Sequence, residues 1–289
     1  MKAAWLMSFL SILQILNVGC NSGKRINDSI NCRSQKFQDS LLVKYSDNGA
    51  EKLPYYYNNP VWGSYFDTIL SICPNVAAAY QLKAVPAIKN GEYAKAYALD
   101  KKAAELDPAH YLPYLAFLKC IFTKDYSGAI IEFKKANMIL PGGAEMDHNF
   151  SFYLGLCYLE LRNYKEAEAY FNTDIFSQNH GDSTREVHFN SLLYMGITKL
   201  ENARLDSAEI YLKRSICLYQ QLPEANFYLA RVYKKRNELK LERKYLEIAK
   251  TALTDGYSMN EDNLYYVNYP KQITMLEINQ ALIADTDKH

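Results

Sequence analysis

Apolar and polar residues alternate with a helical period through most of this chain. Apolar side chains recur on one face of residues 79–89, a break follows at Asn90-Gly91, and a second such segment covers residues 93–106. Apolar residues three and four positions apart are typical of amphipathic helices, and a glycine between two of them marks a turn. The pattern therefore predicts a helical hairpin that ends at Asp107-Pro108.

The hairpin pattern recurs along the chain. A large apolar residue followed three positions later by an alanine opens the second helix four times, and a degenerate fifth copy has a glutamate instead. These positions are Ala96, Ala129, Ala167, Ala208 and Glu242. The intervals between them are 33, 38, 41 and 34 residues. A period of about 34 residues, interrupted by two insertions, indicates stacked helical repeats.

The third repeat contains a specific set of marker residues. They are Leu154, Gly155, Tyr158, Asn163, Tyr164, Ala167 and Phe171. This set resembles the tetratricopeptide repeat (TPR), and the resemblance extends over about residues 75–253. It implies an all-α fold, an α-solenoid of antiparallel helix pairs with about five TPR units plus flanking helices. Small residues such as Gly155 and Gly196 let paired helices approach closely, and stacking buries each remaining apolar face.

Some residues depart from the repeat pattern. Pro86 lies within the first helix of the first pair, where a proline costs about 3 kcal/mol and predicts a kink. Asp100 and Asp174 occupy positions that are usually apolar. Beyond the repeats, Pro270 precedes a segment that predicts a helix over residues 271–284. A terminal helix of this kind covers the last exposed face of a solenoid.

The first residues have the features of a secretion signal. Met1-Lys2 precede an apolar stretch at residues 3–16, which is too short and too polar for a membrane span. We therefore expect a signal peptide over residues 1–19. Residues 16–20 resemble a bacterial lipobox, which implies acylation of Cys20 and anchoring in the bacterial envelope, at the periplasmic face of the outer membrane. The alternatives are cleavage nearby without acylation, or an uncleaved anchor.

These features divide the chain into four parts. After the signal peptide, residues 20–52 are expected to form the lipidated N-terminus and a polar tether. The TPR solenoid is expected over residues 53–256. Residues 257–289 are expected to form a C-terminal capping helix and tail.

Composition excludes some classes of partner and site. With 33 basic and 32 acidic residues, the chain lacks the positive charge that binding of nucleic acid requires. None of the six cysteines shares a CxxC spacing, so a zinc site of that type is not expected. Cys32 and Cys73 could form a disulfide in an oxidising compartment; Cys120 and Cys157 are expected to be buried thiols.

Candidate chemistry is confined to one insertion. His180, Asp182, Glu186 and His188 could ligate a transition metal, but a solvated polar loop is the preferred interpretation. The chain contains no HExxH or GxSxG motif and no glycine-rich phosphate loop. We therefore expect no catalytic residues, no metal and no cofactor, and a protein that is not an enzyme.

The family resemblance implies a partner-binding groove on the concave face, lined by the first helix of each pair. The expected lining is apolar in the middle and basic at its C-terminal end, which favours a peptide with an apolar stripe and an acidic flank. The lining residues are Gln81, Val85, Lys89, Leu115, Lys119, Phe122, Phe152, Leu156, Leu193, Ile197, Phe227, Arg231 and Lys234.

Three hypotheses for function remain open at this stage. The first is a scaffold or adaptor that binds a protein or peptide partner in the groove, unless residues 264–282 lie in it themselves. The second is an accessory lipoprotein that binds a small ligand or glycan, favoured if tyrosines form one pocket. The third is an enzyme that uses the loop from His180 to His188.

Overall fold

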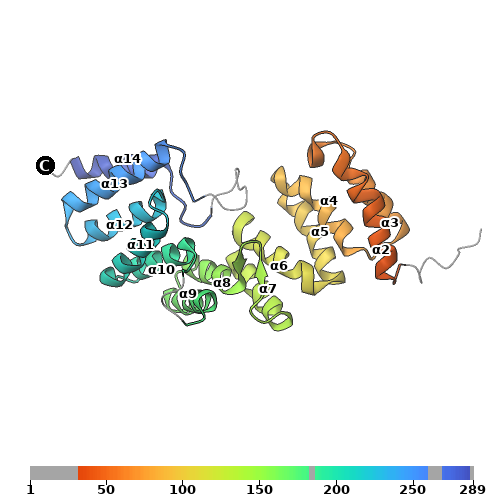
Figure 1. The fold of residues 1–289 in the computed structure, drawn as a ribbon, viewed down its shortest axis with the longest axis horizontal. Coiled ribbons are helices and arrows are strands. Elements are labelled where there is room, and N and C mark those ends of the chain that lie inside the picture. Colours follow the sequence, from red (N-terminus) through yellow and green to blue (C-terminus); the bar gives the residue numbers. More distant parts are fainter. Residues whose placement is uncertain (1–31, 182–185, 260–268, 287–289) are drawn as a thin grey trace, which may run out of the picture.

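The computed structural model describes residues 32–181, 186–259 and 269–286, and the expected signal peptide and acylated Cys20 lie outside them. Its helices follow one another along an arc (Figure 1). The helix pairs are α4 (Ala77–Lys89) with α5 (Tyr93–Leu106), α6 (Pro108–Phe117) with α7 (Tyr126–Ile139), α8 (Phe150–Glu160) with α9 (Tyr164–Asn179), α10 (Phe189–Glu201) with α11 (Leu205–Leu218), and α12 (Pro223–Lys235) with α13 (Leu239–Thr254).

The two helices of each pair are connected through one residue in the left-handed conformation. Gly91, with φ of +75°, has this role in the first pair, and no steric cost arises because glycine has no Cβ. Non-glycine residues take the same conformation in the later pairs. They are Lys124, Arg162, Ala203 and Asn237. A left-handed residue after a helix lets the next N–H groups satisfy the last carbonyl groups, which ends the helix.

Small residues lie where the paired helices cross, as the repeat pattern predicts. A Cβ atom added to Gly196 on α10 would lie 2.7 Å from Cγ of Leu212 on α11. The close contact between α10 and α11 therefore depends on the absence of a side chain at residue 196. A continuous hydrophobic core follows from these crossings and extends from Ala84 on α4 to Leu282 near the C-terminal end.

α4 contains Pro86 and ends at Lys89, the residue at which this helix was expected to end. The helix boundaries differ from the expected ones at the insertion. α9 continues to Asn179, so the first part of the expected insertion is an extra length of helix. A short hairpin of β1 (Ala144–Glu145) and β2 (His148–Asn149) precedes α8.

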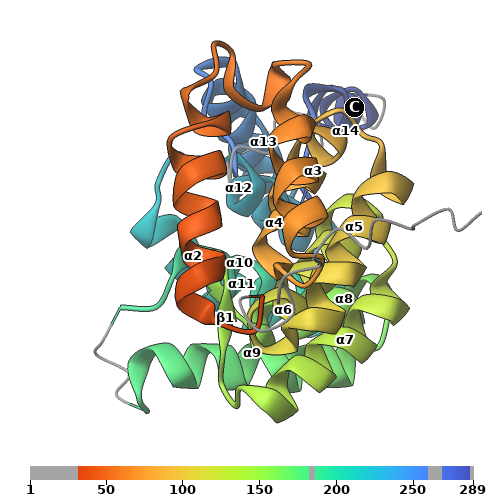
Figure 2. The ribbon, with the colours of Figure 1, turned by 90° about the vertical axis from the view of Figure 1, so that its right-hand side faces the viewer.

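The N-terminal helices form a second hydrophobic cluster. α2 (Gln35–Leu42) continues into a π-helical turn at Val43–Asp47, and short 3₁₀ turns at Ala50–Lys52 and Tyr56–Asn58 lead to α3 (Trp62–Ile72). These elements lie at one end of the arc (Figure 1), and this end faces the viewer in Figure 2. A disulfide joins Cys32 to Cys73.

The tether was expected over residues 20–52, but residues from Gln35 onward form helices. Leu41 is buried in the N-terminal cluster together with Trp62 and Phe66. The sequence of residues 32–52 did not indicate a folded segment because it is mostly polar. In α2 the only buried side chain is that of Leu41. The structured part of the chain begins by Cys32, which the disulfide fixes to the end of α3.

At the C-terminal end, residues 269–274, which we call the strap, lead into α14 (Met275–Thr286), which packs against α13. The helix was expected to begin at residue 271 and instead begins at Met275. Lys271 has a φ of +63°, which is incompatible with the start of a helix. Thr274 and Glu277 form reciprocal hydrogen bonds, Thr274 N–H to Glu277 at 2.8 Å and Glu277 N–H to Thr274 at 3.3 Å, which make a capping box.

None of the helices in the described ranges combines the length and the apolar character that a membrane span requires.

Candidate binding surface

The residues that were expected to line the groove lie on the first helix of each pair or, for two of them, in the π-helical turn Leu118–Phe122 that follows α6, and most of them are buried. A buried residue belongs to the packed interior and is not accessible to a partner. The buried ones are Leu115, Lys119, Phe122, Phe152, Leu156, Leu193, Ile197 and Phe227. Gln81, Val85, Lys89 and Arg231 are half-buried, and Lys234 is exposed.

The basic end of the expected groove is neutralised within the protein. Arg231 lies 3.3 Å from a carboxylate oxygen of Glu201, and Lys234 lies 2.8 Å from one of Glu242. Glu242, the degenerate repeat position, is itself buried. These two cations therefore do not support the expectation that a partner peptide carries an acidic flank.

The strap covers the C-terminal half of the concave face. The hydroxyl of Tyr194 on α10 donates to the carbonyl oxygen of Pro270 at 2.6 Å, and the hydroxyl of Tyr228 on α12 donates to that of Lys271 at 2.9 Å. The Lys271 ammonium lies 3.0 Å from a carboxylate oxygen of Glu160, at the end of α8. Three successive first helices thus hold two consecutive residues of the strap, which are the central residues of a turn that the Gln272 N–H closes on the Tyr269 carbonyl oxygen at 3.1 Å.

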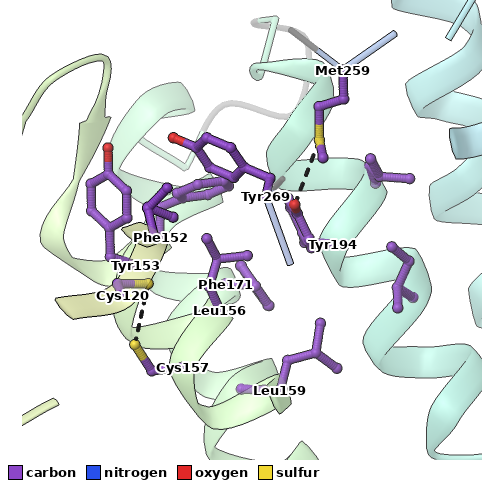
Figure 3. Packing of buried hydrophobic residues seen from close by; sticks show 14 of the residues in the cluster. Cys120, Phe152, Tyr153, Leu156, Cys157, Leu159, Phe171, Tyr194, Met259 and Tyr269 are labelled. Atoms are coloured by element: carbon purple, nitrogen blue, oxygen red, sulfur yellow. Dashed lines mark hydrogen bonds between the residues drawn. The ribbon is translucent and has the colours of Figure 1, made fainter. Parts of the chain in front are cut away.

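Met259, which precedes the strap in the sequence, connects α12 to the strap. Its N–H donates to Glu224 on α12 at 3.1 Å, and its carbonyl oxygen accepts from the side chain of Gln272 at 3.1 Å. The sulfur of Met259 lies 3.5 Å from the hydroxyl of Tyr194, and Figure 3 shows both beside Tyr269. The part of the expected occluding segment that is described, residues 269–282, therefore does lie on the protein's own surface.

Burial sets the protonation of the groups that hold the strap. Desolvation raises the pKa of Tyr228, so its hydroxyl stays protonated and is available as a donor. Desolvation also raises the pKa of Glu224 to about 7, while N–H groups of Met259 and Ile273 stabilise the carboxylate and lower it. The buried carboxyl therefore changes its charge close to neutral pH.

The structure describes only part of the candidate metal loop. Asp182 lies outside the described residues, Glu186 is exposed, and the ring of His188 lies 5.1 Å from that of His148, centroid to centroid. Across the described ranges, no three histidine, cysteine, aspartate or glutamate side chains form a group that could hold a metal ion. His148 instead stacks on Phe152, with 3.8 Å between the ring centroids.

Tyr194, Tyr228, Glu160 and Glu224 make the main polar contacts of this surface, and the expected lining does not include them. A signal for the tyrosines was present in the sequence. Each stands two residues before the small residue of its helix, Gly196 in α10 and Ala230 in α12. No comparable pattern marks the two glutamates.

The stacked helix pairs, the small residues at their crossings and the concave surface of first helices define an α-solenoid of the tetratricopeptide kind. Solved structures confirm the fold. PilW, a "widely conserved type IV pilus biogenesis factor", is similar with a TM-score of 0.57 and 15% identity over 78% of this chain and 94% of that one. MamA from Desulfovibrio magneticus RS-1 is similar with a TM-score of 0.50 and 13% identity over 62% and 93%.

YrrB, "a TPR protein with an unusual peptide-binding site", is similar with a TM-score of 0.48 and 19% identity over 66% of this chain and 93% of YrrB. The similarity to PilW and to MamA confirms the prediction of a TPR-type, all-α solenoid. No protein-family model matches the sequence, and no curated protein matches it.

Proposed function

We propose that this chain is a non-enzymatic scaffold of the bacterial envelope that binds a segment of a partner protein on its concave face. The observation that carries this proposal is the half-buried row of Gln81, Val85 and Lys89 on α4. Residues four positions apart lie on one face of a helix, so these three form one continuous strip. An amide, an apolar side chain and a cation along one strip suit an extended or helical peptide.

The envelope location is supported by three observations. The residues before Cys20 resemble a lipobox, which would make Cys20 the acylated N-terminus and anchor the chain at the periplasmic face of the outer membrane. The disulfide between Cys32 and Cys73 fits an oxidising compartment such as the periplasm. The fold similarity to PilW, a pilus biogenesis factor, agrees with an envelope role.

A partner protein is preferred over a small ligand or a glycan. The small-ligand hypothesis needs inward-facing tyrosines with free hydroxyl groups around one pocket. The hydroxyls of Tyr153, Tyr194 and Tyr228 instead donate to carbonyl oxygens of the protein's own main chain. The half-buried strip on α4 has no tyrosine among its three members.

Site-specific photo-crosslinking in cells tests the scaffold proposal. A photoreactive residue in place of Val85 should give a discrete adduct with a partner protein. The matched control is the same residue in place of Ile131 on α7, which is 54% exposed and lies on a second helix of a pair. Equal labelling at both positions, or adducts at Ile131 alone, would show that the concave face is not the binding surface.

The anchor has a separate test. Cys20→Ser should release the protein from the membrane fraction, and mass spectrometry of the wild-type N-terminal peptide should show a diacylglyceryl group on Cys20. A wild-type N-terminus without lipid would reject the anchor and leave the proposed binding surface unaffected.

A further inference from the structure

Large apolar side chains are exposed along one side of α7 and at its C-terminal end. Ile131 is 54% exposed, Met138 76%, Ile139 47% and Leu140 48%. Met138 and Ile139 follow Ile131 by seven and eight positions, which is about two helical turns, so these three side chains lie on one face of the helix. An exposed apolar patch of this kind marks a surface that another molecule or a membrane covers.

Two exposed lysines, Lys134 and Lys135, lie on the same face of α7. Lys134 donates to the uncharged hydroxyl of Tyr158 at 2.8 Å, and this contact raises the pKa of Lys134, so its ammonium keeps its charge. Lys135 lies 3.3 Å from a carboxylate oxygen of Glu132, but Glu132 also pairs with Lys119 at 3.2 Å. One carboxylate therefore faces two ammonium groups, and the face keeps a net positive charge.

The second helix of the preceding repeat has the same arrangement. Lys101-Lys102 on α5 stand 33 positions before the two lysines of α7, and Leu106 stands 33 positions before Ile139. All three residues of α5 are exposed. Lys102 pairs with Glu105, so Lys101 carries the excess charge. Equivalent positions of neighbouring repeats in a solenoid project in similar directions, so α5 extends the basic and apolar face of α7.

The N-terminal end of the described chain lies beside this face. Cys32 and Arg33 line one open hollow together with Lys102 and Leu106 of α5. The expected acylation site, Cys20, precedes Cys32 by 12 positions, which span at most about 40 Å when fully extended. An anchor at Cys20 would therefore hold α5 and α7 within reach of the membrane surface.

A membrane surface with anionic lipids has the chemistry that this face requires. Exposed apolar side chains enter the boundary between headgroups and acyl chains, and lysines beside them keep their ammonium groups at the level of the phosphates. Each cation near an anionic leaflet strengthens binding about five-fold.

We propose that the exposed lysines and apolar side chains of α5 and α7 dock on the anionic phospholipid leaflet in which Cys20 is anchored. The proposal rests on the proposed function, in that it uses the lipid anchor, and it adds the orientation of the protein on the membrane. α5 and α7 are second helices, whereas the strip formed by Gln81, Val85 and Lys89 lies on a first helix. Docking therefore leaves that strip available to a partner protein.

The test measures co-sedimentation of the chain that begins at residue 21, which contains every described residue and carries no lipid. Vesicles of equal parts phosphatidylglycerol and phosphatidylcholine should bind it at least ten-fold more tightly than vesicles of phosphatidylcholine alone. Binding should weaken as the salt concentration rises, because salt screens the attraction between lysines and phosphates.

The lysines are tested by the double change Lys134→Gln and Lys135→Gln, which should weaken binding to the anionic vesicles about 25-fold. The matched control is Lys235→Gln with Lys240→Gln, two exposed positions around the turn between α12 and α13. It removes the same charge and should change binding by less than about two-fold. Circular dichroism checks that both variants remain folded.

The apolar contact is tested with a polarity-sensitive fluorophore on a single introduced thiol. In a Cys217→Ser background, which removes the exposed native thiol, the fluorophore at Met138→Cys should emit at shorter wavelength when anionic vesicles are added. The matched control is Leu276→Cys on α14, a position that is 65% exposed, where the emission should not change.

Three results would overturn the inference. They are equal binding to vesicles with and without phosphatidylglycerol, equal losses from the two pairs of lysine changes, and equal emission shifts at the two labelled positions. A discrete protein adduct from a photoreactive residue in place of Ile131 would assign the face to a protein instead. The vesicle measurements depend neither on acylation of Cys20 nor on crosslinking at Val85, so their failure can be told apart from failure of the proposed function.

Discussion

Gly155 on α8 lies directly against the ring of Phe171 on α9: a Cβ atom added to the glycine would come within 2.7 Å of Cε1 of that ring. Phe171 is fully buried, so its ring has no free space into which it can move. The close approach of these two helices therefore depends on the missing side chain, as the family resemblance implies.

Gly155→Val should destabilise the protein by about 3 kcal/mol, because overpacking a rigid crossing forces side chains and backbone apart. Urea unfolding followed by circular dichroism measures this change. Gly63→Val on α3 is the matched control, since a Cβ atom there meets nothing within 4 Å. Its stability should change by less than about 1 kcal/mol. Equal effects at the two glycines would mean that α8 and α9 do not cross as described.

The helix pairs could be predicted because their signal is local and repeated. Alanine recurs at the position of Ala167 in three other repeats, and an apolar residue recurs at that of Phe171 in three. The second helix of the first pair, residues 93–106, has the expected boundaries. Later turns lack glycine, as at Arg162 and Ala203, yet repeat spacing was sufficient to place them.

The concave surface could not be predicted in the same way. Its contacts join residues far apart in sequence, such as Tyr194 and Pro270, which are separated by 76 positions. Leu193 and Ile197 were expected in the groove because they lie on a first helix. The sequence does not show which segments pack over that helix and bury them. The capping box of Thr274 and Glu277, in contrast, is a local signal that would have placed the start of α14 correctly.

The buried thiols should be protected from alkylation. Sγ of Cys157 lies 3.5 Å from Sγ of Cys120, both residues are fully buried, and burial raises the pKa of the Cys157 thiol (Figure 3). Iodoacetamide reacts with thiolate, so both should be modified only after unfolding. Cys217 is exposed and serves as the internal control in the same native sample. Mass spectrometry locates the adducts, and native labelling of Cys157 at the rate of Cys217 would contradict the packing.

Removal of the disulfide should loosen the N-terminal cluster. The double change Cys32→Ser and Cys73→Ser removes a cross-link between residues 41 positions apart. The free energy of unfolding of the N-terminal cluster should fall by about 3 kcal/mol. In a chain that begins at residue 21, Trp62 is the one tryptophan, and it is buried with its indole N–H donating to the carbonyl oxygen of Leu82 at 3.0 Å.

Tryptophan emission should therefore shift to longer wavelength in the double variant at a lower urea concentration than in the parent. The far-ultraviolet signal of the repeats should change little at that point. Cys217→Ser, a change at the exposed free cysteine, controls for the loss of a sulfur. Coincident transitions in the parent and the double variant would show that the disulfide does not stabilise the cluster.

Asp100 on α5 should make stability fall as pH rises. The residue is fully buried, neither carboxyl oxygen has a hydrogen-bond partner in the part of the chain that the structure describes, and desolvation raises its pKa from 3.8 to about 8. Between these values the folded protein holds a proton that the unfolded chain releases, so the free energy of unfolding decreases from about pH 4 to about pH 8. One pKa unit corresponds to about 1.4 kcal/mol, so the total loss is on the order of 6 kcal/mol.

Asp100→Asn removes the titrating group and should become progressively more stable than the wild type as pH rises from 5 to 9. Asp100→Leu should add to this gain, because Phe171 and Leu212 occupy the equivalent positions of later repeats. Asp255→Asn, at an exposed site, controls for the change from a carboxylate to an amide. The comparison with Asp100→Asn isolates this carboxyl from Glu224, whose raised pKa acts in the same direction. A constant difference between Asp100→Asn and the wild type from pH 5 to 9 would show that the carboxyl is solvated and that α5 does not bury it.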